Sequence, residues 1–103
     1  MSASLDSTSV ALIARDFALD ESEMTWTVDD VRRLLAHRIA ELLDQQPVFL
    51  MSLLYRIDVR EPKVKHALQH SPPDRLALDL AELVIARQLE KAALRATYRV
   101  DRG

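Results

Sequence analysis

Two histidines in the second half of the chain, His66 and His70, have the spacing of a helical metal site. Residues four apart share one face of a helix, so both imidazoles could reach the same ion. A protein metal site needs at least one further ligand, however, and Pro72 ends this segment directly afterwards. We therefore expect no metal site and interpret both histidines as exposed residues near a helix C-terminus, where cations are favoured.

No group of residues has the spacing of an active site. The chain has no Cys, which excludes a thiolate nucleophile, and its single Gly is the last residue, which excludes a Gly-rich phosphate-binding loop. Ser52 lies in an apolar stretch without a neighbouring His, and Asp58 and Glu61 are better explained as helix caps than as a general acid and base. We therefore expect no catalytic residues, no cofactor and a protein that is not an enzyme.

Basic side chains leave nucleic-acid binding as the alternative function. A helix up to Ile57, a short turn and a second helix over about 63–69 would form a helix-turn-helix, in which Lys63 and Lys65 would face a groove. On the last helix, further basic residues at four-residue steps could meet phosphates. They are Arg87, Lys91 and Arg95. The turn has no Gly, however, and the net charge is −2, so a solvated basic row is the preferred interpretation.

The composition predicts a single all-α domain. The 103 residues amount to one domain, 1–103, and 49% of them are hydrophobic, which is enough for a core. A β-rich fold of this length would need more turn glycines than one. We expect a compact bundle of four to five helices with a buried central helix and a long C-terminal helix, and with 1–4 and 99–103 flexible.

Charge is spread unevenly along the chain. Residues 1–30 contain seven acids and one base, a balance of −6, whereas residues 31–103 contain nine acids and thirteen bases, a balance of +4. The acidic segment could dock on a basic body, its own or a partner's, but a solvated surface is the simpler interpretation. No signal peptide is visible and no apolar stretch is long enough for a bilayer, so we expect a cytoplasmic protein without membrane contact.

The stretch from Pro47 to Ile57 is the one around which we expect the rest of the chain to be organised. Eight of its eleven residues are large and apolar, and they point in every direction around a helix. A short buried strand is the rival structure, but Pro47 suits the first helical position and the run is rich in Leu and Met. The rest of the chain or a second copy must then cover this helix on all sides.

Three helices of ordinary or short length accompany the central one. The first should run from about Asp6 to Leu19, the second from Thr27 to about Gln45, and a short one from Lys63 to Gln69. Thr27 and Asp30 have the spacing of a capping box, with Asp in place of the usual Glu. Trp26, just before this cap, could pack on the following turn as a hydrophobic staple.

The last helix should run from a cap at Ser71, with Pro72 in its first position, to about Tyr98, which is about 39 Å. Its apolar side shifts part-way along. The first half is lined by Leu76, Leu80, Leu83 and Val84, and the second half by Ile85, Leu89, Ala92 and Ala96. A helix with two apolar faces contacts two things, so we expect the second face to be a homodimer interface. A monomer with a sandwiched helix is the alternative.

Three stretches resemble small bacterial all-helical proteins of unknown function. They are Leu53-Leu54-Tyr55-Arg56-Ile57-Asp58-Val59, Lys63-Val64-Lys65 and Ala86-Arg87-Gln88-Leu89-Glu90-Lys91. The resemblance implies a bacterial protein, but no activity, cofactor or catalytic residue. The sequence as a whole predicts a non-enzymatic helical interaction or regulatory module that acts as a homodimer. A helix-turn-helix nucleic-acid-binding protein is the alternative.

Overall fold

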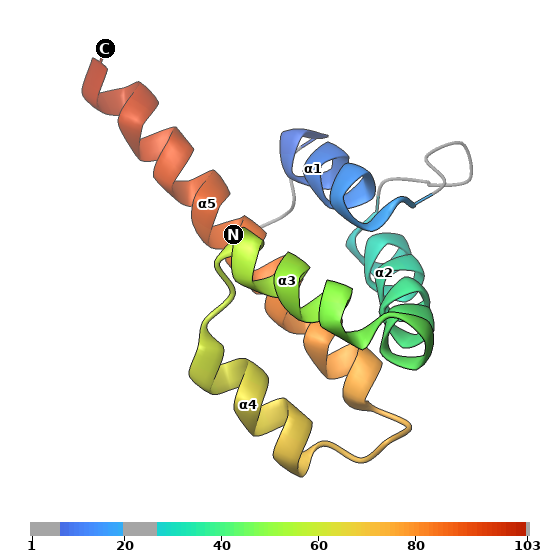
Figure 1. The fold of residues 1–103 in the computed structure, drawn as a ribbon. Coiled ribbons are helices and arrows are strands. Elements are labelled where there is room, and N and C mark those ends of the chain that lie inside the picture. The colour runs from blue at the N-terminus through green and yellow to red at the C-terminus, as the bar shows by residue number, and fades with distance from the viewer. Residues whose placement is uncertain (1–6, 20–26, 103) are drawn as a thin grey trace.

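The computed structural model of the chain describes residues 7–19 and 27–102, and every regular element in these ranges is an α-helix (Figure 1). Along the chain they are α1 (Ser7–Phe17), α2 (Val28–Gln45), α3 (Pro47–Ile57), α4 (Glu61–His70) and α5 (Leu76–Arg102). The predicted all-α bundle of four to five helices with a long C-terminal helix is thereby confirmed. The expected Asp6 start and Trp26 staple lie outside the described residues.

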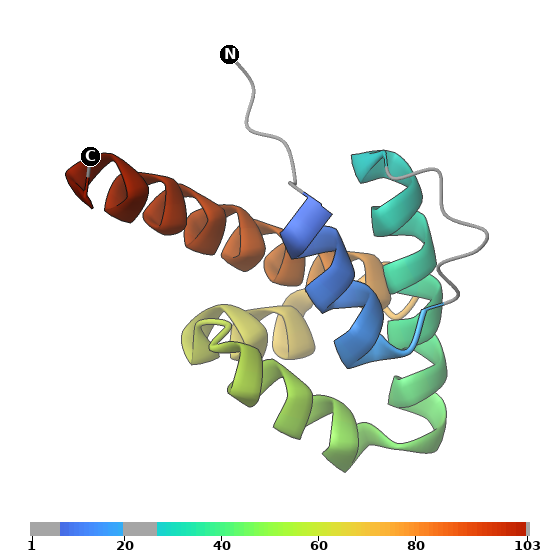
Figure 2. The ribbon, with the colours of Figure 1, turned by 90° about the horizontal axis from the view of Figure 1, so that it is seen from above.

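The helix on which the others pack is α5. All four other helices contact it, α2 most extensively, while its C-terminal end extends beyond them (Figures 1 and 2). Arg32 of α2 donates a hydrogen bond from Nε to Glu82 of α5, and this bond raises the pKa of the Arg32 guanidinium. The helix around which the others are organised is thus α5 and not Pro47–Ile57. With 27 residues, α5 is about 40 Å long, which lets it contact all four other helices, whereas an 11-residue helix is too short to do so.

One apolar cluster forms the core, and all five helices contribute to it. In each helix the buried residues recur at steps of three and four, which is the amphipathic pattern visible in the sequence. The buried members from α1 and α2 are Val10, Ile13, Ala14, Phe17, Val31, Leu35, Ile39 and Leu42. Those from α3, α4 and α5 are Leu50, Leu53, Leu54, Ile57, Val64, Ala67, Leu80, Ala81, Val84 and Ile85.

The predicted cap does begin α2. Thr27 Oγ1 accepts a hydrogen bond from the Asp30 backbone N–H at 3.1 Å and donates one to the Asp30 carboxylate at 2.7 Å. Arg33 also donates to this carboxylate, at 2.8 Å. These bonds, that of Thr27 foremost, hold the pKa of the Asp30 carboxyl below its ordinary value of 3.8. The ionised form of Asp30 is therefore the one that stabilises the helix start.

Replacing Asp30 with Asn should lower the unfolding temperature at neutral pH and have little effect in acid. Because the folded-state pKa is lowered, the contribution of Asp30 is full above the unfolded-state value of 3.8 and is lost as the pH falls through the folded-state value. Thermal unfolding of both proteins at about pH 7 and about pH 2 measures the difference.

The matched control for this variant is Asp44→Asn at the other end of α2. The helix macrodipole disfavours a carboxylate there, so its removal should not lower the unfolding temperature. An effect of Asp30→Asn that is as large in acid as at neutral pH would contradict the assigned role of the ionised carboxylate.

Two helices, α1 and α3, end in the same way although neither is followed by glycine. The residues directly after them, Ala18 and Asp58, have left-handed backbone conformations, with φ of 55° and 69°. The next N–H, of Leu19 or Val59, bonds the carbonyl five residues earlier at 2.9 and 3.1 Å respectively, which is a Schellman motif. Asp58 therefore closes α3, and the expectation that it caps the following helix is wrong.

The central apolar segment is a helix, as predicted, but the rest of the chain covers only one face of this helix. The buried residues of α3 are Leu50, Leu53, Leu54 and Ile57. Val48, Phe49 and Tyr55 are 79%, 46% and 83% exposed. The expectation that the rest of the chain wraps this helix on all sides is therefore wrong, because α2 and α5 pack on one side of it. A cover from a second copy, the other expectation, stays a prediction.

The start of the last helix lies later than the sequence predicted. Ser71 is extended, the N–H groups of Arg75 and Leu76 bond the Pro72 carbonyl at 2.9 and 3.0 Å, and α5 begins at Leu76. The physical reason is Pro73, which disfavours helical backbone in the preceding residue and so keeps Pro72 out of the helix. Ser71 is consequently the residue that ends α4 and not the cap of α5.

Candidate functional site

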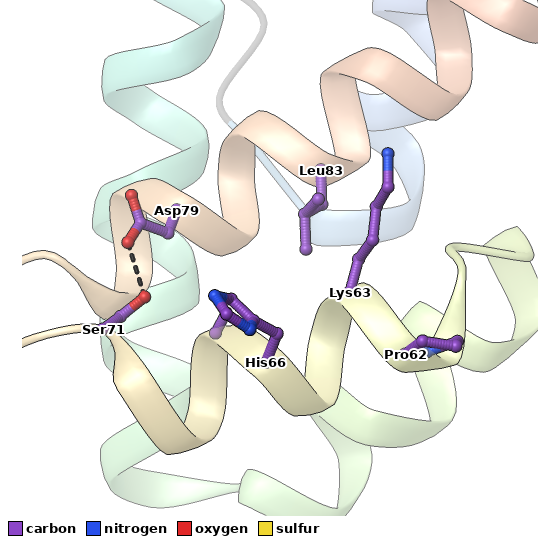
Figure 3. A pocket seen from close by; sticks show the side chains of 7 residues that line it. Pro62, Lys63, His66, Ser71, Asp79 and Leu83 are labelled. Atoms are coloured by element: carbon purple, nitrogen blue, oxygen red, sulfur yellow. Dashed lines mark hydrogen bonds between the residues drawn. The ribbon is translucent and has the colours of Figure 1, made fainter.

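A hollow of about 360 Å³ that contains several polar side chains lies between α4 and α5 (Figure 3). In the close view, His66 lies between the hydrogen-bonded pair Ser71–Asp79 on one side and Lys63 with Leu83 on the other. The set includes the three residue types of a nucleophilic triad, Ser, His and Asp. The geometry of the hollow decides whether they can act together.

The Ser71 hydroxyl of this hollow is not placed as a nucleophile. In a triad the His lies between Ser and Asp and takes the Ser proton. Here Ser71 Oγ donates directly to the Asp79 carboxylate at 2.6 Å, and within the described part of the chain no hydrogen bond joins His66 to either residue. The Ser71–Asp79 bond instead ties the turn after α4 to the first turns of α5.

The two histidines of the suspected metal spacing, His66 and His70, lie side by side on α4 with ring centroids 4.5 Å apart. Both are exposed. Across residues 7–19 and 27–102, no group of three or more His, Cys, Asp or Glu side chains is arranged to hold a metal ion. The structure thus adds no third ligand to the pair.

Two of the three basic residues on α5 that the sequence suggested for nucleic acid are bonded to other residues of the chain. Arg87 is 22% exposed and lies between two carboxylates, with Nη2 3.0 Å from Asp58 and Nη1 3.1 Å from Glu90. Arg95 donates to Ser9 Oγ of α1 at 3.0 Å. Lys91 lines a hollow that α5 forms with α1 and α3. The three do not form the single solvated row that their four-residue spacing suggested.

The basic residues on α4 are also separated from each other. Lys63 lines the hollow toward α5, whereas Lys65 Nζ lies 3.4 Å from the Glu61 carboxylate, one turn earlier on the same helix. A helix-turn-helix reader would need both side chains to face one groove. Nucleic-acid binding stays a prediction, and this arrangement gives it no support.

The residues suggested as a dimer interface are placed in different environments. Ile85 is 3% exposed and belongs to the core of its own chain. Leu89 packs against this core, Ala92 is half-buried and Ala96 is exposed. The second apolar face of the last helix is therefore covered in part by its own chain, because α1 and α3 also pack on α5. Ile85 is not available to a partner.

A different apolar surface is exposed on α3 and α4. Val48, Met51 and Tyr55 follow one another at helical spacing along α3, and Leu68 of α4, 43% exposed, faces the same hollow as Met51 and Tyr55. This hollow of about 270 Å³ is floored by Leu54, Val59 and Val64. We call Val48, Met51, Tyr55 and Leu68 the α3–α4 surface. The ion pair of Glu61 and Lys65 lies at its edge.

The sequence contained a signal for the α3–α4 surface that helical periodicity makes visible. Val48, Met51 and Tyr55 are spaced three and four apart, as are the buried residues on the other side of the same helix. Two apolar stripes on one short helix indicate two contacts. The sequence indicated that this helix is apolar in every direction, but it did not show which of the two stripes the chain itself buries.

Comparisons with known proteins found no matching family model, no matching curated protein and no matching solved structure. Among the helices of the described residues, none combines the length and the apolar character that a membrane span requires. The function is therefore inferred from the geometry of this chain.

Proposed function

We propose that the protein is a non-enzymatic helical interaction module that forms a homodimer through the α3–α4 surface. The observation that carries this proposal is the exposure of large apolar side chains on a short helix, with Val48 79% and Tyr55 83% exposed beside an apolar hollow. Single exposed apolar residues are normal, whereas a contiguous patch edged by polar residues is typical of an interaction site.

The proposed interface is isologous, so that the same surface of both copies meets across a two-fold axis. With the two α3 helices antiparallel and the axis near Met51, Val48 of one copy lies opposite the partner's Tyr55. At each end of the helix pair, an apolar side chain of one copy then packs on an apolar side chain of the other copy. The hollow between α3 and α4 receives the Tyr55 ring or the Met51 side chain from the partner.

The energetics suit a reversible dimer. Full burial of a side chain of this size stabilises by about 1.5–3 kcal/mol, and association costs about 4–15 kcal/mol of lost freedom. Four side chains from each copy, partly buried already, therefore contribute a free energy of about the same size as this cost, which fits a weak, reversible dimer. We expect a dissociation constant on the order of micromolar.

The test is the molar mass in solution of the wild type and of two charge variants. Wild-type protein should be a dimer at high micromolar concentration, and Tyr55→Glu should be a monomer because it places a carboxylate inside the interface. Leu94→Glu is the matched control: Leu94 is also apolar and 53% exposed, but lies on α5 and outside the α3–α4 surface. It should remain a dimer.

Light scattering during size-exclusion chromatography distinguishes the two surfaces directly. A monomeric wild type at high micromolar concentration would end the proposal. A dimer that Leu94→Glu breaks and Tyr55→Glu leaves intact would move the interface to the C-terminal helix, where the sequence analysis had expected it. Circular dichroism of each variant checks that the helices are retained.

A further inference from the structure

A buried glutamine on α5 has no explanation in the packing of the core. Gln88 is 2% exposed and continues the stripe of Leu80, Val84 and Ile85 at steps of three and four, where an apolar residue would be expected. Its Oε1 is buried without a hydrogen-bond partner. Buried polar groups in native proteins are almost always paired, so an unpaired acceptor indicates a missing donor.

A hollow that could hold a ligand with such a donor lies next to Gln88. It has a volume of about 220 Å³, and three helices converge on it. Its lining is Leu12, Arg15 and Asp16 of α1, Arg56 and Ile57 of α3, and Gln88 and Lys91 of α5. The space is sufficient for a small molecule. It shares no residue with the α3–α4 surface.

The charge of this hollow is positive. Three of the lining residues are cations and one is an anion. Arg15 Nε lies 3.7 Å from the Asp16 carboxylate, which leaves Arg56 and Lys91, and neither has an ion pair within the described part of the chain. Two unpaired cations beside a buried neutral acceptor match a ligand that carries about two negative charges and a hydrogen-bond donor.

We infer that this hollow binds a small phosphate monoester that carries a hydroxyl group. A phosphoryl group has a charge of about −1.5 to −2 at neutral pH and three acceptor oxygens. Arg56 contributes a planar fork of donors to these oxygens and Lys91 a point charge. Because Oε1 is covered by its neighbours, the Gln88 side chain must turn toward the hollow for the ligand hydroxyl to donate to it. The site is independent of the proposed dimer, because neither the cations nor Gln88 belong to the α3–α4 surface.

The role of Gln88 is tested with three probes, namely glycerol 3-phosphate, inorganic phosphate and glycerol. Glycerol 3-phosphate should bind the wild type more tightly than inorganic phosphate does by about tenfold, the effect of one well-placed hydrogen bond to a buried group. Glycerol, which lacks the charge, should not bind. Titrations followed by two-dimensional NMR should shift the amide signals of Arg56, Gln88 and Lys91.

The decisive variant is Gln88→Met, which keeps the size and helical preference of the side chain and removes the acceptor. It should fold and have an unfolding temperature equal to or above that of the wild type, because a buried unpaired acceptor has been removed. It should bind glycerol 3-phosphate no more tightly than inorganic phosphate, and bind inorganic phosphate as the wild type does. Lys91→Gln should weaken both ligands, whereas Lys63→Gln, at the other hollow, should weaken neither.

Three results of affinity measurements could each overturn the inference. They are the absence of binding of glycerol 3-phosphate at millimolar concentration, equal affinity of the ester and inorganic phosphate for the wild type, and unchanged affinity of Gln88→Met for the ester. Shifts spread over all the basic residues, in place of the three at the hollow, would show unspecific anion binding and would overturn it equally.

Discussion

Leu50→Ala should destabilise the protein by about 2–5 kcal/mol, whereas Val48→Ala on the same helix should change the stability by less than about 0.5 kcal/mol. Leu50 is 0% exposed and lies in the core, so its truncation leaves a cavity where α3 packs on the rest of the chain. Val48 is 79% exposed and leaves none. Domains of this size have a total stability of about 5–15 kcal/mol, so the Leu50 variant loses a large part of it.

Urea unfolding followed by circular dichroism measures both changes. The measurement is made at low micromolar concentration, so that the proposed dimer contributes little. Equal costs for Leu50→Ala and Val48→Ala under these conditions would mean that α3 is covered on both sides within one chain. A cost for Val48→Ala that appears only at high protein concentration would instead come from the dimer.

Phe17→Ala should destabilise the protein by about 3–5 kcal/mol, the usual cost of removing a buried aromatic ring. Phe17 is 1% exposed at the end of α1, and its carbonyl accepts a hydrogen bond from Arg38 Nε of α2 at 2.9 Å. The ring and the carbonyl together hold the end of α1 against the body. Loss of the ring should therefore loosen α1 as well as lower the global stability.

The chain offers a matched control, because its other phenylalanine lies on the surface. Phe49 is 46% exposed, and Phe49→Ala should cost well under half as much as Phe17→Ala. Hydrogen exchange should show faster exchange in α1 for the Phe17 variant alone. Equal effects of the two substitutions would contradict the placement of α1 in the core. A cost of Phe17→Ala that shrinks on dilution would indicate that α1 packs on a second copy.

Much of the local structure could be predicted because it depends on residues that are near in sequence. The predicted end of the second helix at Gln45 and the cap formed by Thr27 and Asp30 are both confirmed. Pro47 does begin a helix. Two caps were predicted wrongly. Asp58 ends α3 and does not cap the next helix. The predicted cap at Ser71 neglected Pro73, which keeps Pro72 out of the helix.

The candidate sites were harder to predict, because each depends on side chains from helices that are distant in sequence. The ion pair of Arg87 with Asp58 joins residues that are 29 apart in sequence. Because of this pair, Arg87 does not belong to a solvated basic row. Gln88 was visible as a polar residue within an apolar stripe, but only the approach of α1 and α3 shows that it adjoins a positive hollow. The spacing of apolar residues along one helix does not indicate which other helix covers each of its faces.

By itself, the sequence determined that this chain forms an all-α bundle, and it determined most helix bounds. Caps, prolines and apolar spacing act within a few residues, so they can be recognised along the chain. Only the tertiary structure decided that α5 is the central helix, that Ile85 is internal and that Tyr55 is exposed. An apolar face must be buried, but its free energy is nearly the same whichever apolar face covers it. Which helix covers a given apolar face therefore depends on the shape and length of the whole chain.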